Sequence, residues 1–218
     1  MPNMTPSPDD IARRRFLRLL LAAPFAPLAL AGLGSASEAA AAEARLAAVA
    51  SGRSTALTPE CGDDDEPTPP QTEGPFFKPR SPERVSLLEP GMTGTRIELA
   101  GRVYGPNCRP IAGALVDFWH ADDEGVYDND GFRCRGHQFT DAEGRYRLTS
   151  VVPGLYPGRT RHFHVRLQPR GGKILTTQLY FPGEARNRRD GIFRHELLMA
   201  VDDTRKPWRA GFHFVLEA

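Results

Sequence analysis

Short apolar or alternating segments, separated by turns rich in glycine, proline and aspartate, recur through most of this chain. Residues 95–104 alternate as a strand, and G-P-N-C-R-P-I-A-G at 105–113 has turn chemistry. Residues 114–120, A-L-V-D-F-W-H, carry large apolar side chains on both faces, which is typical of a central strand. The 21 Gly and 20 Pro among 218 residues favour many turns and short strands over long helices.

The remaining strands are expected at 137–140, 145–150, 161–167, 175–181, 196–201 and 211–216. We expect 137–140 and 145–150 to form a hairpin-like unit around the D-A-E-G turn. About eight short strands with turns at intervals of roughly ten residues predict an all-β fold, an antiparallel β-sandwich, over residues 72–218. The 40% hydrophobic content is sufficient for its core.

The first 36 residues have the features of a twin-arginine export signal. The basic run A-R-R-R-F-L-R at 12–18 precedes an apolar stretch from Leu19 to about Leu33. Prolines interrupt this stretch, and it is shorter than the about 20 apolar residues that a spanning helix needs. We therefore expect no stable membrane anchor after processing and a periplasmic or extracellular location. Cleavage is expected near Ala31 or Ala36.

Residues 37–71 are expected to be a disordered or extended lead-in, because they are first Ala-rich without an apolar face and then acidic and proline-rich. An exported protein can keep disulfides, and three cysteines allow one bridge with one left over. We expect Cys61 to pair with Cys108 and Cys134 to be free. The pairs Cys108–Cys134 and Cys61–Cys134 stay open. The 28 basic and 27 acidic residues argue against nucleic acid as a partner.

The segment R-H-F-H-V-R-L at 161–167 places two imidazoles on one face of a strand. His162 and His164 alternate with apolar residues that would enter the core. Two histidines at i and i+2 form a ready pair of metal ligands, although H-x-H also occurs on ordinary solvated strands. Tyr156 lies just upstream in P-G-L-Y-P-G, whose turns can fold its phenol back toward the histidines.

Tyr127 follows the expected central strand in the polar loop D-D-E-G-V-Y-D-N-D-G-F. With Tyr156, His162 and His164 it makes a set of two phenols and two imidazoles. A phenol with a pKa of about 10 becomes a ligand at neutral pH only when a strong Lewis acid replaces its proton. Fe(III) does this well, whereas zinc favours Cys, His and carboxylate, and Fe(II) facial triads include a carboxylate.

At these residues the sequence resembles the intradiol ring-cleavage dioxygenases, the family of protocatechuate 3,4-dioxygenase and catechol 1,2-dioxygenase. The resemblance runs from Q-T-E-G-P-F-F at 71–77 to about residue 181, through the motifs V-D-F-W-H-A, T-D-A-E-G-R-Y, P-G-L-Y-P-G, R-T-R-H-F-H and T-T-Q-L-Y-F-P-G. It implies four iron ligands: Tyr127, Tyr156, His162 and His164. It also implies that Arg159 and Gln178 act in catalysis. Arg161 competes with Arg159, because the connection between Tyr156 and the histidines is shorter than in either named enzyme.

The resemblance implies a non-haem Fe(III) enzyme that cleaves a small catechol-type substrate between its two hydroxylated carbons. O2 is the co-substrate and a cis,cis-muconate the product. The displaced phenolate of Tyr156 would accept a proton, Arg159 would stabilise negative charge on the substrate, and Gln178 would orient it. The preferred catechol and the oligomeric state are not predicted.

The alternative hypothesis is a non-catalytic, exported prealbumin-like β-sandwich that binds a glycan or a protein. The pattern G-R-V, P-I-A-G-A-L-V, D-A-E-G-R-Y also suits such modules. His120 is expected to pack or to support the site rather than to bind metal.

Overall fold

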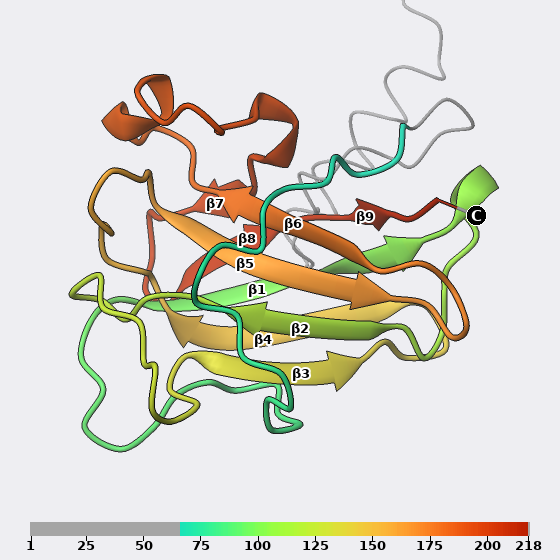
Figure 1. Cartoon of the computed structure of the whole chain (residues 1–218), viewed down its shortest axis with the longest axis horizontal. Coiled ribbons are helices and arrows are strands. Elements are labelled where there is room, and N and C mark those ends of the chain that lie inside the picture. Colours follow the sequence, from blue (N-terminus) through green and yellow to red (C-terminus); the bar gives the residue numbers. More distant parts are fainter. Residues whose placement is uncertain (1–65, 218) are drawn as a thin grey trace, which may run out of the picture. The chain divides into compact units, whose positions relative to one another are not determined.

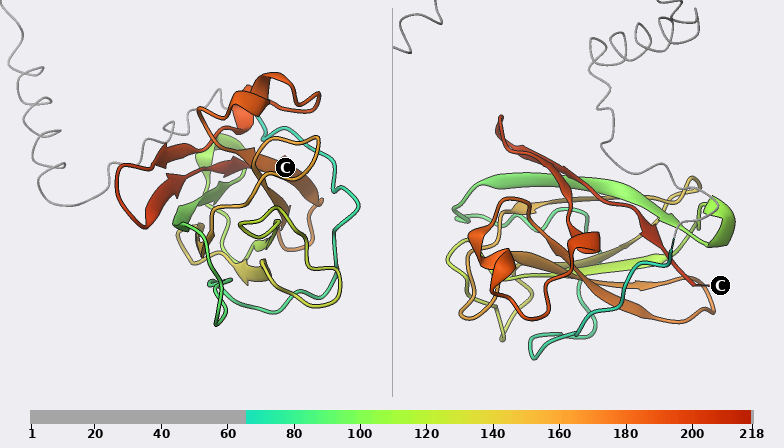
Figure 2. Two further views of the ribbon diagram at one scale, coloured as in Figure 1. Left: turned by 90° about the vertical axis from the view of Figure 1, so that its left-hand side faces the viewer. Right: turned by 90° about the horizontal axis from the view of Figure 1, so that it is seen from above.

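Two β-sheets lie face to face in the part of the chain that the structure, a computed structural model, describes, residues 66–217 (Figure 1). Figure 2 shows the same layers end-on and from above. The expected signal peptide and most of the expected lead-in lie outside the described residues. Within those residues no helical segment has the length and hydrophobicity to span a bilayer.

The first sheet has the strand order β4-β1-β8-β7, and β9 also pairs with β1. Its strands are β1 (Arg96–Tyr104), β4 (Arg145–Val151), β7 (Ala200–Asp202), β8 (Trp208–Gly211) and β9 (Phe214–Val215). The second sheet has the order β3-β2-β5-β6. Its strands are β2 (Leu115–Trp119), β3 (Arg135–Phe139), β5 (His162–Gln168) and β6 (Leu175–Tyr180). Three short 3-10 helices complete the elements: η1 (Pro106–Cys108), η2 (Ala185–Arg188) and η3 (His195–Leu197).

The core lies between the sheets and is built from alternate residues of their strands. On β1, Ile97 and Leu99 are buried while Glu98 is exposed. On β5, Phe163 and Val165 enter the same hydrophobic cluster. A slip of one residue would turn these apolar side chains outward, so burial specifies the register. The all-β prediction is confirmed, and β2 lies between β3 and β5 as expected for a central strand.

The predicted hairpin-like unit around the D-A-E-G turn is wrong. β3 pairs with β2 in one sheet, whereas β4 pairs with β1 in the other, so the turn is a crossing between sheets. The side chain of Gln138 joins the two strands where no backbone ladder does. Its Nε2 donates to the carbonyl oxygen of Arg147 at 2.5 Å, and its Oε1 accepts the backbone N–H of Arg147 at 3.1 Å.

The C-terminal strands also differ from the expected bounds. The segment expected as a strand at 196–201 begins in η3, and β7 starts only at Ala200. The segment expected at 211–216 is divided between β8 and β9. At this break the ring of His213 accepts the backbone N–H of Arg102 on β1 at 2.9 Å, where a continuous strand would offer a carbonyl oxygen.

Two of the three cysteines are described. Cys108 is disulfide-bonded and Cys134 is a buried free thiol, which excludes both pairings that involve Cys134. Burial raises the pKa of the Cys134 thiol to about 12, so it is protonated and unreactive at neutral pH. Cys61, the expected partner of Cys108, lies outside the described residues.

A covering segment, residues 68–81, crosses the outer face of the β3-β2-β5-β6 sheet, seen in teal in Figure 1. The backbone N–H of Gln71 donates to Thr176 on β6 at 2.8 Å. At the other end, Ser81 Oγ donates to Asp117 on β2 at 2.8 Å. Backbone pairing begins at Thr68, before the expected domain start at residue 72. The segment therefore covers the sheet face that carries the paired histidines.

Candidate metal centre

The strand register gathers the predicted site residues of the second sheet on its outer face. Trp119 pairs with His164 across β2 and β5, and His164 pairs with Gln178 across β5 and β6. His162 pairs with Tyr180 one step along the same ladder face. Because directly paired side chains lie on the same side of a sheet, these five residues share one face under the covering segment.

The two imidazoles point their Nε2 atoms toward each other, 3.1 Å apart. His162 Nδ1 lies 2.7 Å from the carbonyl oxygen of Thr160 and must donate to it, so His162 Nε2 carries a lone pair. Burial lowers the pKa of His162 to about 4, and the charge of Arg159 adds to this effect. Burial likewise lowers the pKa of His164 well below its ordinary value. Both rings are therefore neutral at pH 7, the form that binds metal.

The hydrogen-bond pattern of His164 is incomplete without a further group. Its Nδ1 is buried and has no partner among residues 66–217. If Nδ1 carries the proton, two Nε2 lone pairs face each other at 3.1 Å. If Nε2 carries it, a buried Nδ1 lone pair is unpaired. A cation between the Nε2 atoms relieves the first case, and the separation suits two neighbouring ligands with metal–nitrogen bonds of about 2.0–2.1 Å.

The phenol of Tyr127 joins this pair, with its oxygen 3.3 Å from His162 Nε2. The Tyr127 ring is buried and stacks on Phe76. Burial raises the pKa of Tyr127 well above its ordinary value, although Arg159 opposes the effect. Ionisation of this phenol therefore requires a nearby cation such as a bound metal.

Tyr156 lies beside this group on the loop before β5. Its ring is edge-on to Tyr127, with centroids 5.7 Å apart and planes at 80°. Its side chain also packs edge-on against Phe76, with centroids 5.4 Å apart. Tyr156 is only half-buried, in contrast to Tyr127. The structure thus brings together the four predicted ligand residues, with three donor atoms in contact and the second phenol ring adjacent.

Arg159 and Gln178 are joined directly. Arg159 Nη2 donates to Gln178 Oε1 at 2.6 Å, and Arg159 Nε donates to Asp190 Oδ2 at 2.8 Å. Gln178 Nε2 donates to the carbonyl oxygen of Thr72 on the covering segment at 2.9 Å. The charge of Arg159 acts on the pKa values of both histidines, which lie on the same side of the sheet.

Arg161 points elsewhere. Its Nε donates to Glu184 Oε1 at 2.6 Å, and its Nη1 donates to the carbonyl oxygen of Pro153. Of the two competing arginines, Arg159 is therefore the one that contacts Gln178.

The sequence did not predict a role for two residues near the site, Arg135 and Asp190. Arg135 is fully buried, and its guanidinium donates to the carbonyl oxygens of Asp128 and Phe76, the chain neighbour and the stacking partner of Tyr127. Asp190 holds Arg159. Charged residues are ordinarily solvated, and only tertiary contacts distinguish these two.

His120 packs rather than contacting the donor group. It is buried, its Nε2 lies 2.8 Å from Ser150 Oγ, and its Nδ1 donates to the carbonyl oxygen of Ala121. Its ring packs edge-on against Phe163 in the core. Among residues 66–217 no three His, Cys, Asp or Glu side chains cluster closely enough to hold a metal.

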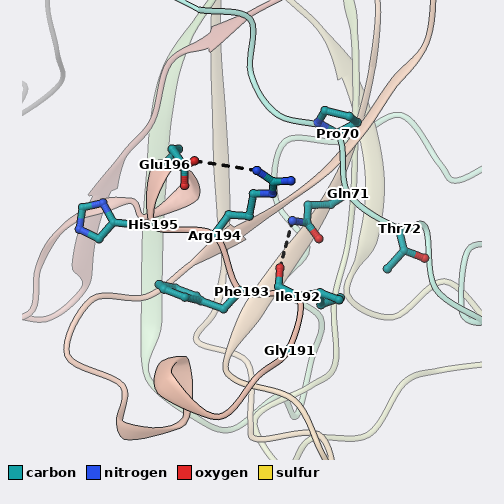
Figure 3. A pocket seen from close by; sticks show the side chains of 9 residues that line it. All are labelled: Pro70, Gln71, Thr72, Gly191, Ile192, Phe193, Arg194, His195 and Glu196. Atoms are coloured by element: carbon teal, nitrogen blue, oxygen red, sulfur yellow. Dashed lines mark hydrogen bonds and ion pairs between the residues drawn. The ribbon is translucent and has the colours of Figure 1, made fainter.

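An open pocket of about 610 Å³ lies near this site, between residues 70–72 and 191–196 (Figure 3). Gln71 Nε2 donates to the carbonyl oxygen of Ile192 across it at 3.0 Å. None of the predicted ligands lines this pocket, so it is separate from the donor atoms of the candidate metal centre.

Comparisons with known proteins agree with the resemblance. A family model described as "Dioxygenase" matches residues 72–207. A solved dioxygenase domain, from a dioxygenase and carbohydrate-binding protein fusion of Streptomyces sp. SirexAA-E, has 52% sequence identity and a TM-score of 0.69, covering 70% of this chain and 99% of that one.

Two curated relatives are similar over part of their length. The protocatechuate 3,4-dioxygenase beta chain of Burkholderia cepacia is 35% identical over 139 residues, 56% of this chain and 58% of the relative. Catechol 1,2-dioxygenase 2 of Acinetobacter lwoffii is 32% identical over 143 residues, 54% of this chain and 52% of the relative. The chain thus spans somewhat more than half the length of these relatives.

Proposed function

This chain belongs to the intradiol ring-cleavage dioxygenase family, and we propose that it is a non-haem Fe(III) enzyme that cleaves a catechol-type ring between its two hydroxylated carbons. O2 is the co-substrate and a cis,cis-muconate the product. The observation that carries this proposal is the convergence of three donor atoms. His164 Nε2 and the Tyr127 oxygen lie 3.1 and 3.3 Å from His162 Nε2.

Four side chains would hold the metal: Tyr127, Tyr156, His162 and His164. The neutral state of both imidazoles and the approach of their Nε2 atoms to 3.1 Å support this ligand set. Fe(III) would supply a Lewis acid that ionises the phenols and the catechol hydroxyls and makes the ring electron-rich toward O2. The partial exposure of Tyr156 would let its phenol oxygen reach a bound substrate and accept a proton from it.

Arg159 and Gln178 would act on the substrate. Arg159 holds a positive charge beside the histidines, where it would stabilise negative charge that develops on the bound ring. Gln178 Oε1 accepts from Arg159 and lies 3.1 Å from the hydroxyl of Tyr180, so its orientation is determined. The Gln178 amide then has one N–H beyond its bond to Thr72 with which to orient a substrate oxygen.

Aromatic residues would keep water away from the reacting ring. The Trp119 ring stacks on His164, with centroids 4.9 Å apart and planes at 6°. Phe76 and Phe77 pack on Tyr127 and Trp119 from the covering segment. This surrounding strengthens electrostatic interactions inside the site.

The substrate we propose is a small catechol. The relatives are named for protocatechuate, catechol, hydroxyquinol and chlorocatechol, whose shared element is a pair of adjacent ring hydroxyls. Two such oxygens can chelate one ferric ion. We therefore propose a substrate with two adjacent ring hydroxyls and do not specify its other ring substituents.

We also propose that the protein is exported by the twin-arginine route to the periplasm or the cell exterior. The basic run at 12–18 and the apolar stretch after it support this location. The disulfide-bonded state of Cys108 agrees with an oxidising compartment.

The test of the proposed function is the visible spectrum of the purified, iron-loaded protein. Phenolate-to-iron charge transfer should make it red, and anaerobic addition of catechol should shift the band as substrate replaces a phenolate. A protein that binds no iron and stays colourless would instead support the hypothesis of an exported binding module.

A further inference from the structure

Two ion pairs connect the loop of residues 156–161, which carries Tyr156, to the segment of residues 184–190. Arg159 Nε lies 2.8 Å from Asp190 Oδ2, and Arg161 Nε lies 2.6 Å from Glu184 Oε1. The pairs are two residues apart on the loop and have similar lengths. They differ in what else their arginines contact, because only Arg159 reaches Gln178.

Asp190 is the more enclosed of the two carboxylates. Its side chain is 2% exposed, against 23% for Glu184. Its Oδ2 accepts the Nε–H of Arg159 and the backbone N–H of Thr160, and its Oδ1 accepts the backbone N–H of Ile192. Burial by itself would raise the pKa of Asp190, but these bonds hold it below the ordinary value. The group is therefore a carboxylate at neutral pH.

The contacts of Asp190 determine the orientation of the Arg159 guanidinium. A guanidinium is a rigid plane, so two bonds along its edge define its orientation. Nε is held by Asp190 and Nη2 by Gln178, which leaves Nη1 as the nitrogen outside these two bonds. Without Asp190, Arg159 would lose the bond at its Nε and could rotate about its bond to Gln178.

We propose that Asp190 is a positioning residue, which holds the Arg159 guanidinium in the plane needed to stabilise charge on the bound substrate. The inference rests on the proposed function and adds to it a residue that contacts neither metal nor substrate. Asp190 lies 31 residues from Arg159 in sequence, so the segment after β6 controls a side chain of the loop before β5.

The test compares Asp190→Ala and Asp190→Asn with Glu184→Gln, in the iron-loaded full chain with catechol as the probe substrate. Asp190→Ala should lower kcat by about 10- to 100-fold with little change in KM, since small misplacements of charge-stabilising groups have effects of this size. Asp190→Asn keeps one of the two acceptor oxygens and should lower kcat less than Asp190→Ala does. Glu184→Gln, which weakens the parallel ion pair, should stay within about 2-fold of wild type.

Two further measurements separate positioning from a general structural role. The visible band and iron content should be unchanged in Asp190→Asn, because the hydrogen bonds of Asp190 go to Arg159, Thr160 and Ile192 and to none of the predicted ligand side chains. In an Arg159→Ala background, adding Asp190→Asn should lower kcat no further, because Asn can still accept a backbone N–H and the proposed effect of Asp190 on the substrate is exerted through Arg159. A further loss there, or an equal loss in Glu184→Gln, would overturn the inference. An active wild type whose kcat is insensitive to both Asp190 variants refutes the inference alone, whereas a wild type that cleaves no catechol refutes the proposed function as well.

Discussion

The ring of Phe76 lies face to face with the ring of Tyr127, with centroids 4.4 Å apart and planes at 14°. Phe76 belongs to the covering segment and not to either sheet. Its neighbour Phe77 packs edge-on against Trp119, with centroids 5.0 Å apart. Residues that precede the first strand therefore complete the wall of the candidate metal centre, and changes in this segment should affect the site.

Tyr127→Phe removes one phenol oxygen and keeps the ring that stacks on Phe76. We expect a folded protein that unfolds at nearly the wild-type temperature, has lost its red colour, and turns over catechol more than about 100-fold more slowly. Visible spectra and steady-state rates check this. Tyr104→Phe is the control, since Tyr104 is the last residue of β1 in the other sheet and packs on His213. A red, fully active Tyr127→Phe protein would remove Tyr127 from the ligand set.

Gly74→Ala tests the contact between the covering segment and His164. Gly74 has φ of +69°, and an added Cβ would lie 3.3 Å from His164 Cε1. Gly91 has φ of +78° with nothing within 4 Å of an added Cβ, so Gly91→Ala carries similar backbone strain without the contact. Each alanine should cost about 1–2 kcal/mol of folding free energy, measured by urea unfolding. Only Gly74→Ala should also weaken iron binding in a titration, and an equal effect of both variants would contradict the proposed proximity.

Arg159→Ala and Arg161→Ala should separate the two competing arginines. Removing the guanidinium that contacts Gln178 should lower kcat by about 100-fold or more, as expected for a group that stabilises developing charge. Arg161→Ala loses an ion pair with Glu184 and should lower the unfolding temperature more than the rate. Steady-state kinetics on both variants decides, and the reverse order of effects would assign Arg161 to the active site.

His120 predicts an acid sensitivity of folding that is separate from the metal. Burial lowers its pKa from 6.5 to about 4 in the folded protein. Between these values the unfolded chain binds a proton that the folded protein does not, so stability falls as the pH falls through this window. One such histidine makes folding about 2 kcal/mol less favourable at pH 5 than at pH 7. Urea unfolding at both pH values should show that His120→Gln loses about this much of the wild-type pH dependence, and an unchanged dependence would contradict the prediction.

Part of the site could be predicted because strand alternation is a local property. The period of two in residues 161–167 was enough to place His162 and His164 on one face. The turn-rich sequence around Tyr156 was enough to suggest that its ring returns toward them. Local sequence does not tell which strands pair with β5 or in which register. That pairing and register bring Trp119 and Gln178 into one row with His164.

The rest depended on contacts between distant segments. Asp190 stands between two arginines and a glycine, a composition typical of a solvated loop. Its side chain is nevertheless buried against Arg159. The D-A-E-G turn has the local chemistry of a hairpin, but β3 pairs with β2 in one sheet and β4 pairs with β1 in the other. Local turn chemistry cannot distinguish these outcomes, because the choice is made by burial in the assembled core.

The most direct test of the central claim is the identity of the product formed from catechol under air by the iron-loaded protein. Mass spectrometry should show a single product that has gained both atoms of ¹⁸O2 before any exchange with water and co-elutes with cis,cis-muconic acid. A red protein with full iron content that yields a ring-opened semialdehyde, or consumes no oxygen, would contradict the assignment of intradiol cleavage to this site.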